Sequence, residues 1–389
     1  MNRVENKSNY SVRKLLPVLF GFFVMGFVDV VGISTGYVKQ AFGLSDTLAN
    51  LLPMMVFVWF AICSLPTGVL MGKTGRRTMT LVSIAITAIA MLTPLASYSF
   101  VSFLVAFALL GIGNTILQVA LNPLLTDVVE TRKVTGFLTF GQFVKAISSF
   151  LGPLLAGAAA GIFGNWSYIF PVYAAVSILS FIWLYFTPIT EIKETGAVAT
   201  VGFGVIVSLL KDKLMLAWLS IIVLIVGFEI GLVTAIPKYL LERCSLPLEK
   251  GGLGCSLYYA ARTLGAFAGS ILLVRISSRR FILFTLSIAI LSFVLFMLAE
   301  NVWVLMSGLF VTGLMCANVF AIVFSTAIRS DATKANEISA LMIMGVAGGA
   351  LIPPVMGVIA DVSGQWHSLF VPLAALVYLL ACSFYVIKK

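Results

Sequence analysis

Four charged side chains lie inside long apolar stretches of this sequence, where a charge is expensive to hold. They are two acids and two bases: Asp29, Glu229, Lys145 and Arg262. An ionisable group within a membrane-spanning helix is normally paired or faces a cavity, and it marks a functional site by default. A carboxylate at such a position can carry a proton, and a lysine can hold an anion. We therefore expect Asp29 and Lys145 to couple transport to an ion or to bind the charge of a substrate.

The two acids lie in similar surroundings, 200 residues apart. A Gly-Phe pair precedes each acid, and a lysine follows, Lys39 after Asp29 and Lys238 after Glu229. An internal repeat of this kind is typical of transporters whose two halves enclose a site near the middle of the membrane. The sequence therefore predicts a duplicated chain with its site between the halves.

The composition restricts the class of protein. Of the 389 residues, 60% are hydrophobic and 10% are charged, and the mean hydropathy is +1.09. Soluble domains are about 45–50% apolar and about 25% charged. The chain is therefore expected to be an all-α membrane protein.

The positive charges are distributed unevenly along the chain. Of the 25 lysines and arginines, we assign 19 to the termini and loops on one side of the membrane. Four fall on the other side, namely Lys39, Lys238, Arg243 and Lys250. This pattern places both termini in the cytoplasm and predicts a multi-pass protein of the cell inner (plasma) membrane. It also explains the net charge of +10 without a nucleic-acid partner.

A membrane helix needs about 20 apolar residues, and that length predicts twelve helices. They lie near 15–40, 48–71, 78–98, 100–125, 134–163, 166–187, 214–240, 251–275, 281–299, 302–328, 337–361 and 367–387. The connections are short except after residue 187. We therefore expect an N-terminal six-helix half at 1–187, a cytoplasmic linker at 188–213 and a C-terminal six-helix half at 214–389, related by pseudo-symmetry.

Polar side chains share faces of the predicted helices at 100–125 and 134–163. Asn114, Gln118 and Asn122 recur every four residues, and Gln142 lies three residues before Lys145. Amides on one face of a membrane helix either join helices or line a polar cavity. We take them as substrate-binding, together with Lys145 and with Asn318, which occupies the corresponding place in the second half.

The charged groups suggest two pairs. Asp29 and Lys145 have comparable depth, Lys145 being about 16 Å inside its helix at 1.5 Å per residue. Sequence leaves open whether they touch, and a structural ion pair is the alternative to a coupling role. Glu229 and Arg262 form the second expected pair, with a structural or gating role, because arginine is a poor proton carrier.

In the predicted helix at 337–361, several glycines precede Pro353 and Pro354. Small residues let helices approach closely, and a proline disturbs the helical hydrogen bonds. We expect a close-packed segment here, followed by a break at the prolines.

Three stretches resemble a known family. They are residues 39–44, the end of the amide-bearing helix at 118–123, and residues 344–361. The basic turn around Lys73, Arg76 and Arg77 also resembles the loop signature of the major facilitator superfamily, with Gly72 where that signature has an acid. At these residues the chain is similar to the fucose–galactose–glucose:proton symporter branch of that superfamily.

The resemblance implies a fold of two six-helix halves and a sugar substrate taken up with protons. In that family an acid on the first helix and a glutamate on the fourth serve coupling, and amides on the fourth and fifth contact sugar. The acid corresponds approximately to Asp29, the glutamate falls on Gln118, and an asparagine falls on Lys145.

We therefore expect a secondary active transporter that takes up a sugar or sugar acid with protons by alternating access. The alternative is a transporter of amphipathic lipids or drugs, in which both charge pairs are structural or gating. Aromatic side chains clustered in the cavity would favour that alternative. No motif for an enzyme, a metal site or a cofactor is evident, and the proton is the expected coupling ion. The expected partners are a small-molecule substrate and the lipid bilayer, and the expected state is a monomer.

Overall fold

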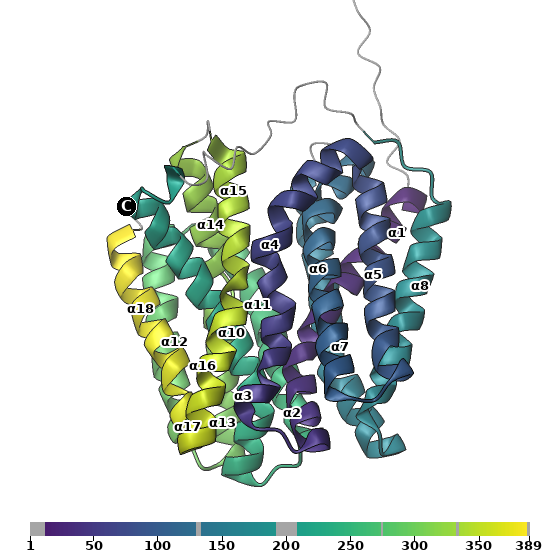
Figure 1. Ribbon diagram of the computed structural model, residues 1–389. Helices are drawn as coiled ribbons and strands as arrows, with labels where there is room; N and C mark the ends of the chain where they lie inside the picture. Colours follow the sequence, from purple (N-terminus) through teal and green to yellow (C-terminus); the bar gives the residue numbers. More distant parts are fainter. Residues whose placement is uncertain (1–11, 130–133, 192–207, 274, 332–333, 387–389) are drawn as a thin grey trace, which may run out of the picture.

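A computed structural model describes residues 12–129, 134–191, 208–273, 275–331 and 334–386 of the chain. These residues are almost entirely helical, and no strand occurs among them. Figure 1 shows two groups of roughly parallel helices side by side, formed by the two halves of the sequence.

The elements follow one another in chain order. The first half contains α1 (Val12–Met25), η1 (Gly26–Val30), α2 (Val31–Phe42), α3 (Asp46–Ala49), α4 (Leu51–Thr74), α5 (Arg76–Ala96), α6 (Phe100–Val128), α7 (Val134–Phe163), η3 (Trp166–Tyr168) and α8 (Ile169–Phe186). The second half contains α10 (Lys213–Cys244), α11 (Leu248–Leu272), α12 (Ser278–Leu298), α13 (Val302–Cys316), α14 (Val319–Ser330), α15 (Ala335–Met344), η5 (Gly345–Ala347), α16 (Gly348–Ser363), α17 (Gln365–Ser368) and α18 (Phe370–Val386).

The predicted membrane helices lie where the sequence places them. Eleven helices within the described ranges are long and apolar enough to cross a membrane. The helix that falls below this threshold is α11, which is 25 residues long and coincides with the span predicted at 251–275. Its glycines and Arg262 lower its hydropathy.

The bundle has two distinct ends. The terminal end carries the start of α1 and the end of α18, at the top of Figure 1, and the clasp end carries α3 and α17 at the bottom. Successive long helices run in alternate directions between these ends, as short connections require.

Each half has a hydrophobic core of its own. One cluster of buried side chains comes almost wholly from residues 15–184, and the other from residues 209–386. The two clusters correspond to the two groups of helices in Figure 1. Residues 192–207 of the predicted linker lie outside the described residues.

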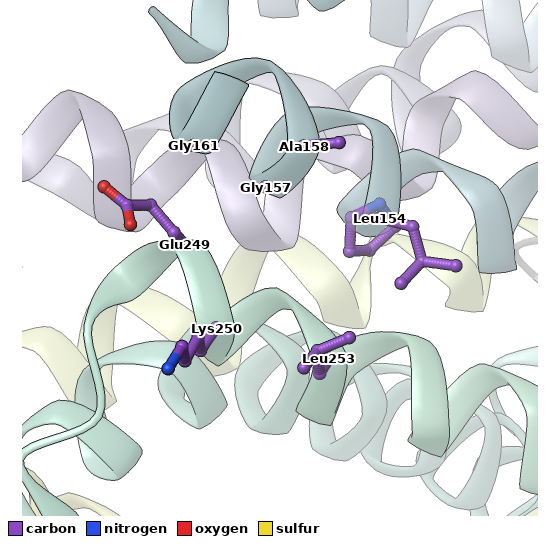
Figure 2. Close-up of a pocket in the computed structure, with 8 residues that line it drawn as sticks. Leu154, Gly157, Ala158, Gly161, Glu249, Lys250 and Leu253 are labelled. Carbon is purple, nitrogen blue, oxygen red and sulfur yellow. The ribbon is translucent and has the colours of Figure 1, made fainter. Parts of the chain in front are cut away.

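The halves meet closely along α7 and α11 toward the clasp end. Ser256 Oγ donates to the carbonyl of Phe150 at 2.9 Å, and a Cβ on Gly252 would stand 2.9 Å from the carbonyl oxygen of Pro153. Figure 2 shows the neighbouring part of this interface, where Gly157, Ala158 and Gly161 of α7 lie opposite Glu249 and Lys250 at the start of α11. A hollow of about 350 Å³ lies there. Only small residues permit such an approach.

Three of the long spans are interrupted near their middle. The first changes from α to 3₁₀ geometry at Gly26–Val30, the span at 302–328 breaks around Asn318, and the next one has a 3₁₀ turn at Gly345–Ala347. The predicted break at Pro353 and Pro354 was wrong, because α16 continues through both prolines. The interruption lies earlier, at Gly345–Ala347, before the turn that the ring of Pro353 would disturb.

Candidate functional site

A cavity of about 170 Å³ lies between the two halves, near the middle of the bundle. Its walls come from η1, from α7, from α11 and from the break between α13 and α14. Its polar lining residues are Asp29, Gln142, Lys145, Ser149, Tyr259, Arg262 and Thr263. Three of the four charged residues that the sequence singled out therefore face one space.

Asp29 lies in the 3₁₀ segment of the first span and is 8% exposed. Its Oδ2 accepts a hydrogen bond from Ser149 Oγ at 2.5 Å. Beside it, the ring of Phe27 stacks on Tyr173 with a centroid distance of 3.8 Å. The carboxylate is thus held by one hydroxyl, and it lines the same polar cavity as Lys145 and Arg262.

Lys145 lines the same cavity on α7. Its side-chain ammonium makes no hydrogen bond or ion pair with any residue in the described ranges. The ion pair with Asp29 that equal depth suggested is therefore absent here. Depth along a helix does not set the direction in which a side chain points, and Asp29 is turned toward Ser149 instead.

Glu229 and Arg262 are in contact, as the sequence suggested. Arg262 Nη1 lies 2.5 Å from Glu229 Oε1, and the two side chains are 37% and 11% exposed. Arg262 also lines the cavity. The C-terminal half therefore presents a neutralised guanidinium to the cavity, while the N-terminal half presents an unpaired ammonium.

The amides are divided between two roles. Asn114 is 1% exposed, its Nδ2 donates to the carbonyl of Met25 at 2.7 Å, and its Oδ1 accepts from Gln118 Nε2 at 2.8 Å. Met25 directly precedes the 3₁₀ segment, where the helical hydrogen bonding changes. Asn114 and Gln118 thus join α6 to the first span instead of lining the cavity.

Asn122 and Asn318 likewise bond to backbone. Asn122 Nδ2 donates to the carbonyl of Gln118 at 3.1 Å, and Asn318 Nδ2 donates to that of Gly265 at 2.7 Å. Among the predicted amides that the structure describes, Gln142 is the one that lines the cavity. We expected the other amides to bind substrate, but in this conformation they do not line the central cavity.

Sequence reasoning missed Tyr259 and Thr263. Tyr259 lies three residues before Arg262 and four residues before Thr263, so all three reach the cavity from one side of α11. The Tyr259 hydroxyl is buried and has no hydrogen-bond partner among the described residues. A search for polar residues beside Arg262 and one turn before it would have found both.

A cluster of charged and polar side chains, here called the clasp, joins the halves at the clasp end. It comprises Lys39, Asp46, Lys238, Asp361 and Gln365. Asp46 Oδ2 lies 2.5 Å from Lys39 Nζ, and its Oδ1 lies 2.8 Å from Lys238 Nζ. Gln365 Nε2 donates to Asp46 Oδ2 at 2.8 Å, and the Asp361 carboxylate accepts from the backbone N–H of Asp46.

The two lysines that follow the repeated acids therefore meet on one carboxylate. Lys39 belongs to the N-terminal half and Lys238 to the C-terminal half. The side chains of Asp46 and Lys238 are 5% and 7% exposed, so water screens this pair weakly. The clasp closes the bundle at this end.

The opposite side of the cavity is more open. On α7, Gln142 is exposed and Ser149 is buried, and on α11, Ala266 is exposed and Ser256 is buried. The exposed member of each pair lies nearer the terminal end. The contact between the halves therefore loosens from the clasp end toward the terminal end.

The basic turn between α4 and α5 is anchored within its own half. Arg76 Nη1 pairs with Asp127 Oδ1 at 2.8 Å. The Glu191 carboxylate accepts the backbone N–H groups of Arg76 and Arg77, which begin α5, at 2.8 and 3.0 Å. A carboxylate at a helix N-terminus is stabilising, so this turn has a structural role.

Comparisons with known proteins agree with this architecture. The model of the Major Facilitator Superfamily matches residues 18–254. The chain is 24% identical over 394 residues to the glucose/galactose transporter of Brucella abortus biovar 1, covering 96% of this chain and 94% of that one. Its fold resembles that of a bacterial homologue of the human lysosomal transporter Spinster in an inward-facing, unoccupied conformation, with a TM-score of 0.75, 18% identity and coverage of 97% and 96%. It also resembles the fucose:proton symporter FucP of E. coli, with a TM-score of 0.67, 15% identity and coverage of 96% and 98%. The family match covers more than half of the sequence, and the chain belongs to the Major Facilitator Superfamily.

Proposed function

We propose that this protein is a secondary transporter that moves a sugar or a sugar acid across the membrane by alternating access. The observation that carries the proposal is the central cavity, where Asp29, Gln142, Lys145 and Arg262 face one space between two separately packed halves. Binding at the interface of two halves that rock against each other is the arrangement expected of such transporters. The relative from Brucella abortus, named a glucose/galactose transporter, supports a sugar as cargo.

The chemistry of the cavity favours a small polar cargo. Among the described residues that line it, Tyr259 is the one aromatic residue, and none is a phenylalanine or a methionine. Carboxylate, amide, hydroxyl and ammonium groups can hydrogen-bond to the hydroxyls of a sugar. A cavity for lipids or drugs would be lined mainly by apolar side chains, so the amphipathic alternative is not favoured.

The proposed orientation places the terminal end in the cytoplasm of the cell, with the protein in its inner membrane. The distribution of lysine and arginine supports this orientation. In that frame the clasp seals the outer side, and the cavity is reached from the inside. No bound cofactor is required by this account.

The charges around the cavity suggest how a proton would be coupled. Asp29 and Glu229 balance Lys145 and Arg262 when all four are ionised. A bound sugar acid would add one negative charge in a poorly hydrated place, and protonation of Asp29 would restore the balance. We propose that Asp29 is the proton-carrying group and that Lys145 binds the substrate.

Counterflow in proteoliposomes tests the cargo without any gradient. Vesicles that contain the purified protein are loaded with unlabelled glucose, galactose or fucose, or with glucuronate or galacturonate, and are diluted into a trace of labelled sugar. Transient accumulation of label with at least one of these cargoes is expected. Absence of counterflow with all five, while the protein remains folded, would contradict a sugar or sugar-acid carrier.

Lys250→Gln is the matched control variant. Lys250 is exposed near the clasp end, and it lines neither the central cavity nor the clasp. Its counterflow should equal that of the wild type, whereas Lys145→Gln should change the ranking of the sugars. Equal ranking in both variants would remove Lys145 from the binding site.

A further inference from the structure

A second hollow lies on the C-terminal half toward the terminal end, and it shares no lining residue with the central cavity. Its volume is about 420 Å³, and its walls come from α11, α12 and α13. Leu272, Phe284, Leu314 and Met315 make it apolar. Leu272 is 45% exposed and Phe284 is 65% exposed, so within a membrane this groove faces the acyl chains of the lipids.

The close approach of α11 and α13 forms the base of the groove. Asn318 Nδ2 donates to the carbonyl of Gly265 at 2.7 Å. A Cβ on Gly265 would clash with the backbone of α13, and a Cβ on Gly269 would clash with the side chain of Asn318. The two helices are thus held together with little side-chain bulk between them. Leu314 and Met315 lie at the base of a groove that is built into the fold.

A positive charge lies at one end of the groove. Arg280, in the first turn of α12, contributes to its lining. Arg275 and Arg279 belong to the same turn of the chain, at the terminal end. Within the described residues, none of these three arginines has an acidic partner.

The corresponding turn of the N-terminal half provides a contrast. There Arg76 is paired with Asp127, and Glu191 accepts the first backbone N–H groups of α5. In the basic turn of the first half, Arg76 therefore has an acidic partner within its own half. The basic turn of the second half has its charge available for an anion from outside the chain.

We infer that this groove binds one anionic phospholipid of the membrane leaflet at the terminal end. Its acyl chain lies against Leu272, Phe284 and Met315, and its phosphate headgroup meets Arg280 at the membrane surface. Basic pockets between membrane helices bind anionic headgroups in this way. A soluble phosphate would match the arginine but would leave the apolar groove unfilled, so the occupant is a lipid.

Native mass spectrometry of the full-length protein tests this site. The purified protein is incubated with equal amounts of phosphatidylglycerol and phosphatidylcholine of the same chain length, and the retained lipids are counted. One arginine near the surface favours the anionic lipid by about fivefold. Arg280→Gln should abolish this preference, and Arg280→Lys should keep it.

A second variant tests the apolar part of the site independently. Ala268 is exposed and lines the groove, so Ala268→Trp should fill it and reduce the retention of both lipids. Lys73→Gln removes an exposed charge from the corresponding turn of the other half and should change nothing. Excess glycerol 3-phosphate should not displace the lipid, because it has no acyl chain.

Four results would overturn the inference. The first is equal retention of the two lipids by the wild type, and the second is an unchanged preference in Arg280→Gln. The third is full retention in Ala268→Trp, and the fourth is displacement by glycerol 3-phosphate; either of these would leave no role for the groove.

Discussion

Lys145 and Arg262 both bring a positive charge to the cavity, but their surroundings differ. Glu229 Oε1 lies 2.5 Å from Arg262 Nη1. The ammonium of Lys145 has no hydrogen-bond or ion-pair partner within the described part of the chain. Lys145 is half-buried. An unpaired charge that is partly removed from water is costly, and a ligand that supplies an anion relieves the cost. Any negative group on the cargo should therefore bind at Lys145 before it binds at Arg262.

Lys145→Gln should weaken the binding of sugar acids much more than that of neutral sugars. A hydrogen bond to a charged group contributes about 1.5–3 kcal/mol, so half-saturation for glucuronate should rise about tenfold to a hundredfold. Half-saturation for galactose should change little. Transport measured over a range of concentrations checks this, and equal shifts for both sugars would contradict it.

Glu229→Gln should destabilise the protein, because it leaves the Arg262 charge without its partner. Breaking a buried pair from one side costs about 3–5 kcal/mol, and we expect the lower part of this range since Arg262 is 37% exposed. Thermal unfolding in detergent measures the effect. The double variant Glu229→Gln with Arg262→Gln should recover most of the loss, and a double variant as unstable as the single one would contradict the pairing.

The sequence predicted how deep these residues lie in the membrane, but it did not predict which side chains they contact. Asp29 and Lys145 lie at similar depth, yet Ser149 holds the carboxylate. Asn114 and Gln118 do share a face of α6, but that face bonds to Met25 and to its own helix. Helical spacing shows which residues lie together, and only packing shows which neighbour they meet.

At the clasp end, hydrogen bonds and an ion pair between α3, α10 and α17 hold the two halves together. Asp46 on α3 binds Lys39 and also Lys238 on α10, and Gln365 on α17 donates to the same carboxylate. Removing that carboxylate would leave Lys238 buried and unpaired. The closed arrangement of these elements therefore depends on the charge of Asp46.

Asp46→Asn should favour opening at the clasp end. Spin labels at Leu48→Cys on α3 and Val362→Cys on α16, both exposed positions, report the separation after the five native cysteines are replaced. Double electron–electron resonance should show a longer distance, or a larger long-distance population, than in the protein with Asp46 intact.

Lys250→Gln is the control for this measurement, because it removes an exposed charge near the same end without touching the clasp. Its distance distribution should match that of the parent protein. An unchanged distribution in Asp46→Asn as well would mean that apolar packing alone keeps this end closed.

Hydropathy predicted the long helices nearly to their ends, because a bilayer demands a minimum apolar length. It did not predict where those helices are interrupted. The segment around Asp29 is as apolar as its flanks, so nothing in its composition distinguishes 3₁₀ from α geometry. At Pro353 and Pro354 the expected break was misplaced, since the distortion lies among the preceding glycines.

At the scale of the whole molecule, two packed halves meet tightly at the clasp end and less tightly toward the terminal end. One state of an alternating-access cycle has this form. The opposite state must break the clasp and bring the terminal-end parts of α7 and α11 together. The cavity with Asp29 and Lys145 lies between the regions that move, so loading can be coupled to the change of state.

The role of Asp29 in proton coupling is tested most directly by uptake into proteoliposomes under an imposed inward proton gradient. The cargo is the sugar or sugar acid that gives counterflow. We expect the wild type to concentrate this cargo, and we expect Asp29→Asn to retain counterflow but no longer to accumulate the cargo with the gradient. Accumulation by Asp29→Asn equal to that of the wild type would contradict the central claim that Asp29 couples the proton to transport.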